Sequence, residues 1–266
     1  MTKPIHVAIH GAAGRMGQRL VALGSGDPNL KIIAAIDKPG HAWAGQDAGV
    51  LAGVGPLNVP LGDTLPEAVD VVIDFSVPTA SLEMLDVCVA RNVPIVVATT
   101  GFSTEQTERV RRASQSIAVL WSPSMSLAVN LAMKLSSIAA DALKGHPSGV
   151  DVEIIERHHR YKEDAPSGTA LKFGQIIREK MGQLHERHGR EGRPGARPHN
   201  EIGYHAVRVG DNPGEHTIIF GLLGETLEIS VRASSRDCYV HGALAAAKFV
   251  SHQAPGLYGM QDVLGI

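Results

Sequence analysis

The 266-residue sequence predicts an α/β protein of two domains: a parallel sheet with helices on its faces, and a second, smaller α+β domain with a mostly antiparallel or mixed sheet. Two observations predict this class. In the first half, short apolar runs typical of buried strands alternate with segments whose apolar residues recur at helical spacing. In the second half, one long helical segment precedes several strands in which apolar and polar residues alternate. A chain of this length does not depend on metal or disulfide staples.

The first half begins with a β-rich run at residues 5–10, which leads directly into a glycine. Apolar residues at helical spacing follow over 14–26, and a Gly-Asp-Pro break at 26–28 ends that segment. The alternation continues along the chain. We therefore expect further strands at 30–37, 69–76, 94–101 and 117–123, and further helices at 79–92 and 104–116.

The second half begins with a helical pattern over 126–144, in which Leu127, Leu131, Leu135 and Ile138 share one face. Clean two-residue alternation then predicts a strand at 150–155. The same reasoning predicts strands at 204–209, 215–222 and 227–231, a helix that starts after residue 169, and a helix at 241–253 that returns to the first domain. We place the three segments of the chain at 1–126, 127–238 and 239–266.

Residues 182–200 are rich in glycine, proline, arginine and histidine, and the segment is too long and too polar for a plain connection. Four arginines in it are candidates for contacts with an anionic substrate or a second subunit: Arg187, Arg190, Arg193 and Arg197. The favoured interpretation is a solvated mobile loop, because polar connections usually lie on the surface.

Composition narrows the class of ligand. A formal net charge of -2 argues against a nucleic-acid-binding protein that depends on positive charge, and favours a small-molecule ligand. Cys88 and Cys238 are the two cysteines, far apart in the sequence, so we expect reduced thiols and no cysteine-based metal site. The N-terminal sequence lacks the sustained apolar run of a signal peptide or membrane span, which indicates a cytoplasmic protein.

The sequence GAAGRMG places Gly11, Gly14 and Gly17 between the first expected strand and the first expected helix. Glycines allow a tight turn and a close backbone approach, and the N–H groups of a helix N-terminus bind a diphosphate. Asp37 ends the second strand about 20 residues further on, where an acid accepts the ribose hydroxyls of NAD. The pattern predicts a dinucleotide site; the alternative is a tight turn without a ligand.

Two neighbouring features extend this prediction. Lys38 is a candidate partner for a 2′-phosphate, with a solvated loop lysine as the equal alternative. The sequence ATTG at 98–101 lies at the carboxyl end of an expected strand, where ligands collect in open α/β sheets. Its alternative is a polar loop before a helix cap, because Ser103 begins a good capping box.

The sequence ERHHRYKEDAPSGTA at 156–170 concentrates proton-transfer groups before a helix start. Ser167 is a natural N-cap, so the N–H groups of Gly168 and Thr169 are expected to point outward as a site for a carboxylate. His158 and Lys162 flank that turn and can donate protons at neutral pH.

For His158 alone, a structural role is the better interpretation. We do not expect a metal site, because adjacent histidines on an extended chain point in different directions and no ligand spacing is present.

At this point the residues carry a resemblance. The sequence EIIERHHRYKEDAPSGTA resembles the signature of the 4-hydroxy-tetrahydrodipicolinate reductase family, also called dihydrodipicolinate reductases. Other matching segments occur in the expected order over nearly the whole chain: VAIHGAAGRMGQ, DFSVP, ATTGF, IGYHAVRVGDNPGEH, ASSRD and GLYGMQDVL. The segment around the two histidines is highly specific, whereas the glycine turn alone is not.

The resemblance implies a Rossmann-like dinucleotide-binding domain, a mixed-sheet domain for substrate binding and oligomerisation, a hinge between them and a homotetramer. It implies reduction of 4-hydroxy-tetrahydrodipicolinate by NADH or NADPH, with loss of water, in lysine and diaminopimelate biosynthesis. Two alternatives stay open: another nicotinamide-dependent two-domain dehydrogenase, which needs no such histidine and lysine cluster, and a non-catalytic nucleotide-sensing protein, which tolerates loss of both residues.

The resemblance also assigns individual residues. It makes His158 the general acid/base and Lys162 a proton donor, and it makes His159, Gly168 and Thr169 substrate contacts. For the cofactor it implies Gly11, Ala12, Ala13, Gly14, Arg15, Met16, Asp37, Lys38, Ala98, Thr99, Thr100, Ser122, Pro123, Ser124 and Met125. Three positions depart from the commonest family pattern, on the nicotinamide side and at the hinge: Ala98, Ser124 and Ala128.

Overall fold

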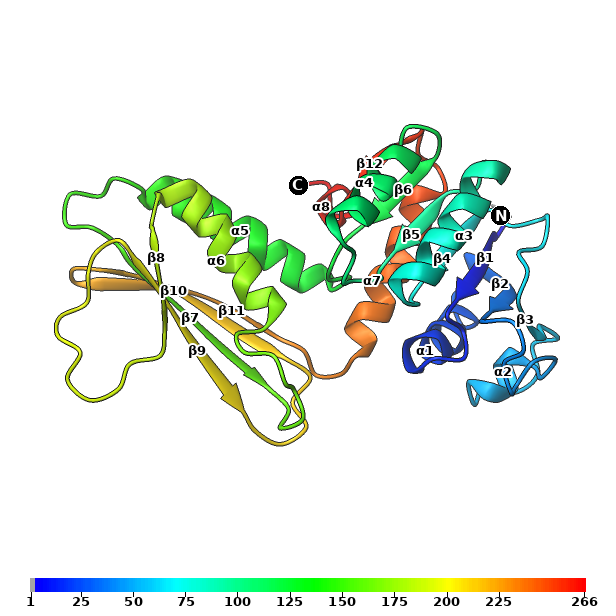
Figure 1. Ribbon diagram of the computed structural model, residues 1–266, viewed down its shortest axis with the longest axis horizontal. Helices are drawn as coiled ribbons and strands as arrows, with labels where there is room; N and C mark the ends of the chain where they lie inside the picture. Colours follow the sequence, from blue (N-terminus) through cyan, green and yellow to red (C-terminus); the bar gives the residue numbers. More distant parts are fainter. Residues whose placement is uncertain (1–2) are drawn as a thin grey trace. The chain divides into compact units, whose positions relative to one another are not determined.

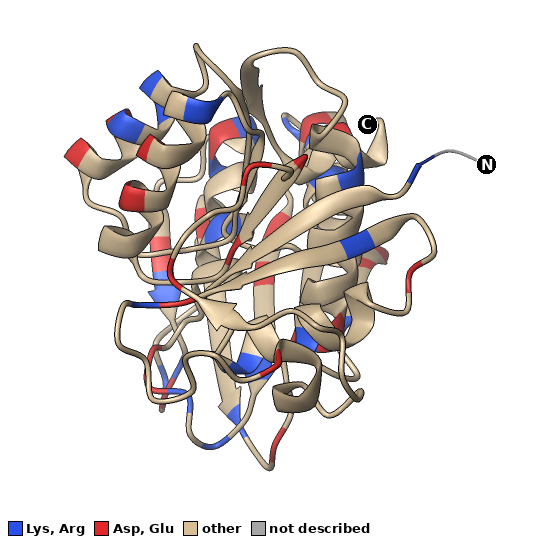
Figure 2. Cartoon of the chain, turned by 90° about the vertical axis from the view of Figure 1, so that its right-hand side faces the viewer, with Lys and Arg blue, Asp and Glu red and all other residues tan. Residues whose placement is uncertain are grey.

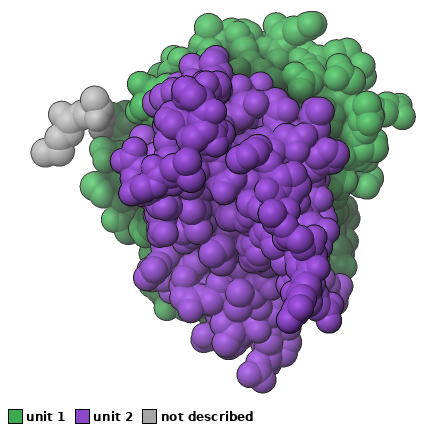
Figure 3. Space-filling model, turned by 90° about the vertical axis from the view of Figure 1, so that its left-hand side faces the viewer, with its two compact units in different colours: residues 1–127, 237–266 green, residues 128–236 purple. Residues whose placement is uncertain are grey.

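The computed structural model describes residues 3–266, which divide into two compact units (Figures 1 and 3). Unit 1 comprises residues up to Leu127 together with Asp237–Ile266, and unit 2 comprises Ala128–Arg236. The C-terminal segment thus belongs with the N-terminal part of the chain. The boundaries placed from the sequence at 127 and 238 differ from those of unit 2 by one and two residues.

Unit 1 is a seven-stranded parallel sheet covered by helices, in the strand order β12-β6-β5-β4-β1-β2-β3. Its strands are β1 (Ile5–His10), β2 (Leu30–Ile36), β3 (Leu61–Gly62), β4 (Val71–Asp74), β5 (Ile95–Val97), β6 (Ala118–Trp121) and β12 (Gly256–Tyr258). Its helices are α1 (Arg15–Gly24), α2 (Ala48–Leu51), α3 (Pro78–Arg91), α4 (Thr104–Ala113), α7 (Asp237–Val250) and α8 (Met260–Leu264). The predicted parallel sheet with helices is confirmed.

The side-chain alternation of the strands creates two cores, one on each face of this sheet. On one face, Val7 and Ile9 pack with the buried residues of α1 and α7. On the other face, Ala8 packs with the buried residues of α3 and α4. Because all strands are parallel, the segments that follow their carboxyl ends lie along a single edge of the sheet.

Unit 2 contains a mixed sheet of five strands in the order β11-β10-β7-β9-β8. The strands are β7 (Asp151–His158), β8 (His185–His188), β9 (Glu201–Arg208), β10 (Glu215–Leu222) and β11 (Glu225–Arg232). β10 is antiparallel to β7 and β11, whereas β9 is parallel to β7 and β8. The sequence-based prediction of a mixed sheet is confirmed.

Helices α5 (Leu127–Leu143) and α6 (Gly168–Met181) pack on one face of that sheet (Figure 1). Val152 and Ile154 of β7 point into this core and are fully buried with Phe173 and Ile177 of α6. The same alternation directs Asp151, Glu153 and Ile155 to the opposite face, which the two helices do not cover.

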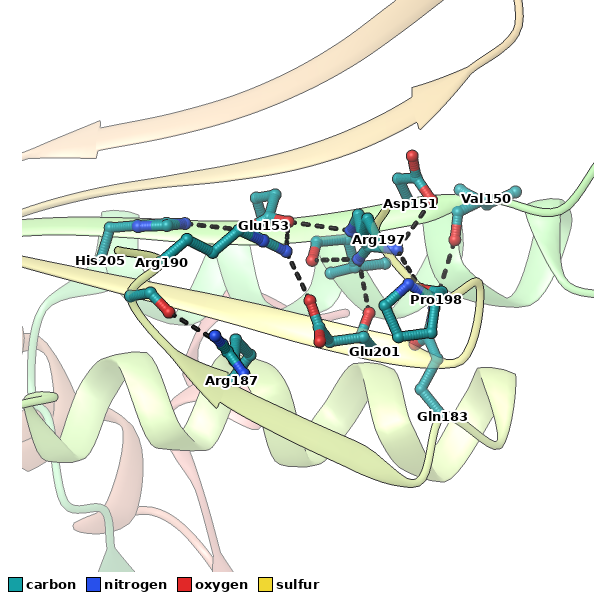
Figure 4. A network of polar contacts seen from close by, with 12 residues as sticks. Val150, Asp151, Glu153, Gln183, Arg187, Arg190, Arg197, Pro198, Glu201 and His205 are labelled. Atoms are coloured by element: carbon teal, nitrogen blue, oxygen red, sulfur yellow. Dashed lines mark hydrogen bonds and ion pairs between the residues drawn. The ribbon is translucent and has the colours of Figure 1, made fainter. Parts of the chain in front are cut away.

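The interpretation of 182–200 as a solvated mobile loop is wrong for two of its arginines (Figure 4). Arg190 and Arg197 both bind Glu153 of β7, at 2.7 and 2.9 Å, and Arg190 also pairs with Glu201. Strand β8, which pairs with β9, also lies in this segment. The sequence did not reveal this order, because the arginines of the segment form ion pairs with acids elsewhere in the chain, such as Glu153.

Glu153 is the centre of this network. Burial alone would raise the pKa of Glu153, but hydrogen bonds from Arg190, Arg197 and His205 lower it to about 2. On the adjacent strand, a Cβ at Gly203 would overlap the Glu153 carboxylate, so the absence of a side chain there leaves room for the network. Arg190 and Arg197 are therefore occupied within the subunit and are not free cations for a substrate.

Both signs of charge are interspersed over the face shown in Figure 2, in keeping with the small net charge. Cys88 and Cys238 are free thiols, as expected. Across residues 3–266, no helix combines the length and the apolar content that a membrane crossing requires.

Candidate active site

The glycine turn after β1 depends on glycine for packing at two positions. Gly11 has φ +77°, and a Cβ there would lie 2.5 Å from the carbonyl oxygen of Phe75. At Gly17 a Cβ would clash with the carbonyl oxygen of Gly11, so this glycine lets α1 approach the turn. Gly14, the N-cap of α1, is exposed. The turn thus brings the start of α1 close to the ends of β1 and β4.

Most N–H groups of the turn already have protein acceptors. Gly11 and Ala12 donate to the carbonyl oxygen of Ile36 at 2.9 and 3.0 Å, and Gly14 donates to that of Gly11. Within residues 3–266, the N–H groups of Arg15 and Met16, in the first turn of α1, have no protein acceptor. These two N–H groups are among those that remain for an anion at the positive end of the helix.

Asp37 and Lys38 follow β2 and line the same pocket as the glycine turn. The Asp37 carboxylate accepts hydrogen bonds from the N–H of Ala13 and the N–H of Lys38, both at 2.9 Å. The pocket has a volume of about 610 Å³. Its lining also includes residues of the segment after β4, such as Phe75 and Ser76. Asp37 is therefore tied to the turn as well as exposed to the pocket.

The other predicted cofactor residues follow β5 and β6 and do not line this pocket. Thr99 is buried, and its hydroxyl donates to the Asp74 carboxylate at 2.7 Å. The Ser122 hydroxyl donates to the carbonyl oxygen of Ser124 at 2.8 Å. Met125 is 2% exposed and belongs to the core beside α7. Parallel pairing nevertheless places these segments at the same sheet edge as the glycine turn.

In unit 2, a buried carboxylate contacts both the histidine and the serine turn of the site predicted from the sequence. Glu156 of β7 is 1% exposed, and its Oε2 lies 2.5 Å from the Nδ1 of His158. Its Oε1 accepts a hydrogen bond from the N–H of Ser167 at 3.0 Å. Arg208 of β9 binds both oxygens through its two terminal nitrogens, each at 2.8 Å. Glu156 therefore fixes the histidine and the turn relative to each other.

The protonation of this cluster follows from its contacts. Burial alone would raise the pKa of Glu156, but hydrogen bonds from Arg208 and His158 hold it below its ordinary value. Burial lowers the pKa of His158, and the positive charges of Lys162 and Arg208 lower it further, against the opposing effect of Glu156. At neutral pH, Glu156 is therefore ionised and His158 largely neutral. Its proton lies on Nδ1, and Nε2 keeps a lone pair.

A second histidine, His216 of β10, supports both His158 and the turn. Its ring packs edge-on against His158 with 5.2 Å between centroids, and its Nε2 lies 3.1 Å from the Ser167 hydroxyl. Burial, and then the charge of His158, lower its pKa to about 4. His216 is therefore a neutral hydrogen-bonding group at neutral pH.

The turn itself has the expected cap. Ser167 caps α6 by accepting a hydrogen bond from the N–H of Ala170 at 3.2 Å. In the part of the chain that the structure describes, the N–H groups of Gly168 and Thr169 have no protein acceptor. A Cβ at Gly168 would meet no atom within 4 Å, so the space in front of these N–H groups is open.

Two further cluster residues lie beside the turn. Lys162 pairs with Asp164 at 2.8 Å, and its side chain is 21% exposed. His159 keeps its Nδ1 buried without a hydrogen-bond partner among residues 3–266. The unit therefore combines an ammonium group, an imidazole with a free Nε2 and two N–H donors at a helix start, which together suit an anionic substrate that accepts a proton.

Two family models match the chain. One is described as dihydrodipicolinate reductase, N-terminus, and matches residues 5–125; the other is described as dihydrodipicolinate reductase, C-terminus, and matches residues 128–264. A 4-hydroxy-tetrahydrodipicolinate reductase from Rhodopirellula baltica is 55% identical over 273 residues, which cover 100% of this chain and 98% of that relative.

Solved structures are similar as well. A dipicolinate-bound dihydrodipicolinate reductase from Paenisporosarcina sp. TG-14 has a TM-score of 0.77 at 28% identity and covers 97% of this chain and 99% of its own. An amine dehydrogenase from Mycobacterium smegmatis has a TM-score of 0.65 at 13% identity, covering 96% and 94% of the two chains, and shows similarity of fold alone.

Proposed function

Because the chain belongs to the dihydrodipicolinate reductase family, we propose that it reduces 4-hydroxy-tetrahydrodipicolinate to tetrahydrodipicolinate, with loss of water, in lysine and diaminopimelate biosynthesis. NADH or NADPH supplies the hydride when bound. The full-length match favours this activity over the other two classes considered, a different nicotinamide-dependent dehydrogenase and a nucleotide sensor. Unit 1 then binds the cofactor, and unit 2 binds the substrate.

The observation that carries the proposal is the junction at Glu156. One buried carboxylate holds the imidazole of His158 and the N–H of Ser167, the residue before Gly168. A proton-transfer group and a carboxylate-binding turn are thereby kept at a fixed separation. A cyclic substrate with two carboxylates needs this pairing, because the group that binds the anion must also place the ring next to the proton donor.

The roles of the proton-transfer residues follow from their charges. Lys162 is the proton donor, because His158 is largely neutral before substrate binds. His158 orients the reacting ring and exchanges protons through its free Nε2. The hydrogen bond to Glu156 keeps the other ring proton on Nδ1. His159 contacts the substrate, which would give its buried Nδ1 a partner.

The residues of unit 1 fit a dinucleotide. The N–H groups of Arg15 and Met16 would bind its diphosphate, and Gly14 leaves that approach without a side chain. Asp37 and Lys38 would contact the adenosine ribose from the end of β2. The segments 98–100 and 122–125, which follow β5 and β6, would approach the nicotinamide side.

A coupled assay tests the function. Pyruvate and aspartate semialdehyde are converted by the preceding synthase, and the absorbance of NADH or NADPH is followed after this protein is added. We expect oxidation of the cofactor only in the complete mixture. Absence of turnover with both cofactors would remove the proposal.

The ribose assignment predicts the cofactor preference of an Asp37→Ala variant. Asp37 favours the free hydroxyls of NADH, whereas Lys38 attracts the extra phosphate of NADPH. Loss of the carboxylate should lower kcat/KM for NADH by about tenfold, the usual effect of losing a charged hydrogen bond, and should shift the preference toward NADPH. Because Asp37 also binds the N–H of Ala13, both cofactors should weaken to some degree.

The matched control is Asp63→Ala, which removes another acid that lines the pocket. The ratio of the two kcat/KM values should stay close to that of the wild type in this control. An unchanged or reversed ratio in Asp37→Ala would show that Asp37 does not distinguish the two riboses.

The anion turn predicts the effect of a Gly168→Val variant on inhibitor binding. Pyridine-2,6-dicarboxylate should bind at the turn and compete with substrate, since its carboxylates resemble those of the substrate. A Cβ at Gly168 would meet no protein atom within 4 Å, so a branched side chain there should crowd the ligand and leave the fold intact. We expect the inhibitor Kd to rise about tenfold, the loss of about one hydrogen bond to a charged group.

Melting temperature and inhibitor Kd should be measured on the same Gly168→Val and Gly168→Ala proteins, with alanine giving the smaller effect. If the folded valine variant kept the wild-type Kd, Gly168 would be only the first residue of a capped helix.

We also propose a cytoplasmic homotetramer, following the family resemblance. The sheet face of unit 2 that α5 and α6 leave uncovered exposes apolar side chains of Ile155 and Val207, which supports a subunit contact there. Sedimentation velocity should give a single species of four chains, and a monomer at micromolar concentration would contradict this.

A further inference from the structure

A buried carboxylate lies at the end of β4, beside the cofactor pocket. Asp74 is 0% exposed and accepts hydrogen bonds from the hydroxyls of Ser76 and Thr99, at 2.5 and 2.7 Å. Burial alone would raise the pKa of Asp74, but the contact with His10 and hydrogen bonds from Ser76 and Ser81 hold it below its ordinary value. The residue is therefore an anion at neutral pH, and a buried anion is costly unless a positive charge is near.

Within the described residues, the ion-pair partner of Asp74 is a histidine. The Nδ1 of His10 lies 2.7 Å from the Asp74 carboxylate, and among residues 3–266 Asp74 has no other ion-pair partner. His10 is the last residue of β1 and points to the opposite sheet face from Ile9. Its side chain is 9% exposed. The buried acid thus holds the ring in one orientation, with the Nδ1 proton directed at Asp74.

The other nitrogen of the ring is available to a ligand. His10 lines the 610 Å³ pocket together with Gly11 and Gly14. Its Nε2 has no hydrogen-bond partner within residues 3–266. When the ring is neutral, Nε2 presents a lone pair, which repels phosphate oxygens. When the ring is protonated, Nε2 presents a charged N–H donor, which binds them.

We propose that His10 is a cofactor-contacting residue whose protonated Nε2 donates to the diphosphate, so that dinucleotide binding is coupled to the uptake of a proton. The proposal rests on the assigned NADH or NADPH dependence and adds a diphosphate contact to it. Asp74 stabilises the imidazolium, and the ligand brings the second negative charge.

The charges of the pocket favour this coupling. The lining contains three acids and one lysine, in addition to His10 and a second histidine: Asp37, Asp63, Glu83, Lys38 and His41. Side chains alone therefore leave an excess of negative charge where a diphosphate must bind. Across residues 3–266, none of these groups forms a hydrogen bond or ion pair with His10. The charges that stabilise a proton at Nε2 are therefore those of Asp74 and of the ligand.

Calorimetric titration of the full-length protein tests the proposal. NADH and ADP-ribose both carry a diphosphate that does not titrate near neutral pH, whereas adenosine carries no phosphate. We expect both diphosphates to bind about tenfold more tightly at about pH 6 than at about pH 8, the value of one charge-assisted hydrogen bond. Buffers of different ionisation enthalpy should reveal proton uptake on binding, and adenosine should show neither effect.

Variants locate the proton. His10→Ala leaves Asp74 unpaired and risks misfolding, so the main variant is His10→Ala with Asp74→Asn, which removes both charges. At both pH values, this double variant should bind ADP-ribose as weakly as the wild type does at about pH 8, and without proton uptake. The control His41→Ala removes the other histidine of the pocket and should keep the wild-type pH dependence.

The outcomes separate the two assignments. Failure of the wild type to bind NADH at either pH would overturn both the cofactor assignment and the proposal. Binding of NADH without proton uptake, or a pH dependence that survives in the double variant, would overturn the role of His10 and leave the reductase function standing.

Discussion

Replacement of Lys162 or of His158 by alanine should lower kcat by about 100-fold or more, the usual range for loss of a positioned general acid or base. In the proposed mechanism Lys162 supplies an ammonium proton, and His158 uses its Nε2 because Glu156 occupies its Nδ1. Steady-state kinetics in the coupled assay measures the effect, with the melting temperature recorded to show that the fold is kept.

Two measurements separate chemistry from binding. The Kd for NADH should change little in both variants, since both residues belong to unit 2 and the dinucleotide residues belong to unit 1. Lys180→Ala, at an exposed position of α6, is the matched lysine control and should keep wild-type kcat. A collapse of NADH affinity in folded Lys162→Ala or His158→Ala protein would contradict their assignment to the substrate side.

The pH profile assigns the two roles. If Lys162 is the donor and His158 acts as a neutral imidazole, Lys162→Ala should lower kcat/KM without removing the acid limb of its pH profile. The acid limb belongs to His158, whose pKa burial lowers, and it should remain in that variant. Loss of the acid limb instead would reverse the assignment.

The class of the fold could be predicted because its signals are local. Strands such as β1 and β2 are mainly apolar runs followed by turn residues, and α4 and α6 begin at serine caps. The capping box predicted at Ser103 is present, with its hydroxyl and the Gln106 side chain bonded reciprocally to the backbone. Strands β3 and β12 have two and three residues, too few to show any period, and they were not predicted.

The candidate site could be predicted only in part, because half of its contacts are long-range. His158, Lys162 and the Ser167 turn occur within one short stretch, so the sequence places them together. Arg208 lies 52 residues from Glu156, and His216 lies 49 residues from Ser167. Both occupy strands that flank β7, and only the pairing of β9 and β10 with β7 brings them to the site.

One signal for the missing residues was present in the sequence. Strand β7 alternates cleanly, and that alternation directs Glu156 to the same buried face as Val152 and Ile154. A buried glutamate is normally paired with a cation, but the sequence does not identify that cation. His10 and Asp74 are a similar case in unit 1, where each is the last residue of a mainly apolar strand.

Arg208→Ala should lower the free energy of unfolding by about 3–5 kcal/mol, the range for removing one partner of a buried ion pair. Glu156 is 1% exposed, and Arg208 is its only arginine or lysine partner among residues 3–266. Without the guanidinium, the carboxylate remains buried with two weaker donors, His158 and the N–H of Ser167. Urea denaturation at neutral pH measures the loss.

The control is Arg157→Ala, at the residue that follows Glu156 on β7. Arg157 is 46% exposed and pairs with Glu215 near the surface, so its removal should cost only about 0–1 kcal/mol. A second variant, Arg208→Ala with Glu156→Gln, removes the buried charge along with its partner. It should be more stable than Arg208→Ala alone, because a neutral amide costs less to bury than an unpaired carboxylate.

The pH dependence gives the sharpest test of this ion pair. Because the folded pKa of Glu156 lies below its ordinary value of 4.5, the ionised form contributes stability above that pH and loses it as the pH falls through the folded pKa. Arg208→Ala removes the main cation that lowers this pKa, so burial then raises it. The stability difference between wild type and Arg208→Ala should therefore be largest at neutral pH and should shrink as the pH approaches about 4, where the variant's carboxyl is already protonated. A difference that stays constant from neutral pH down to this range would show that Arg208 contributes packing rather than charge.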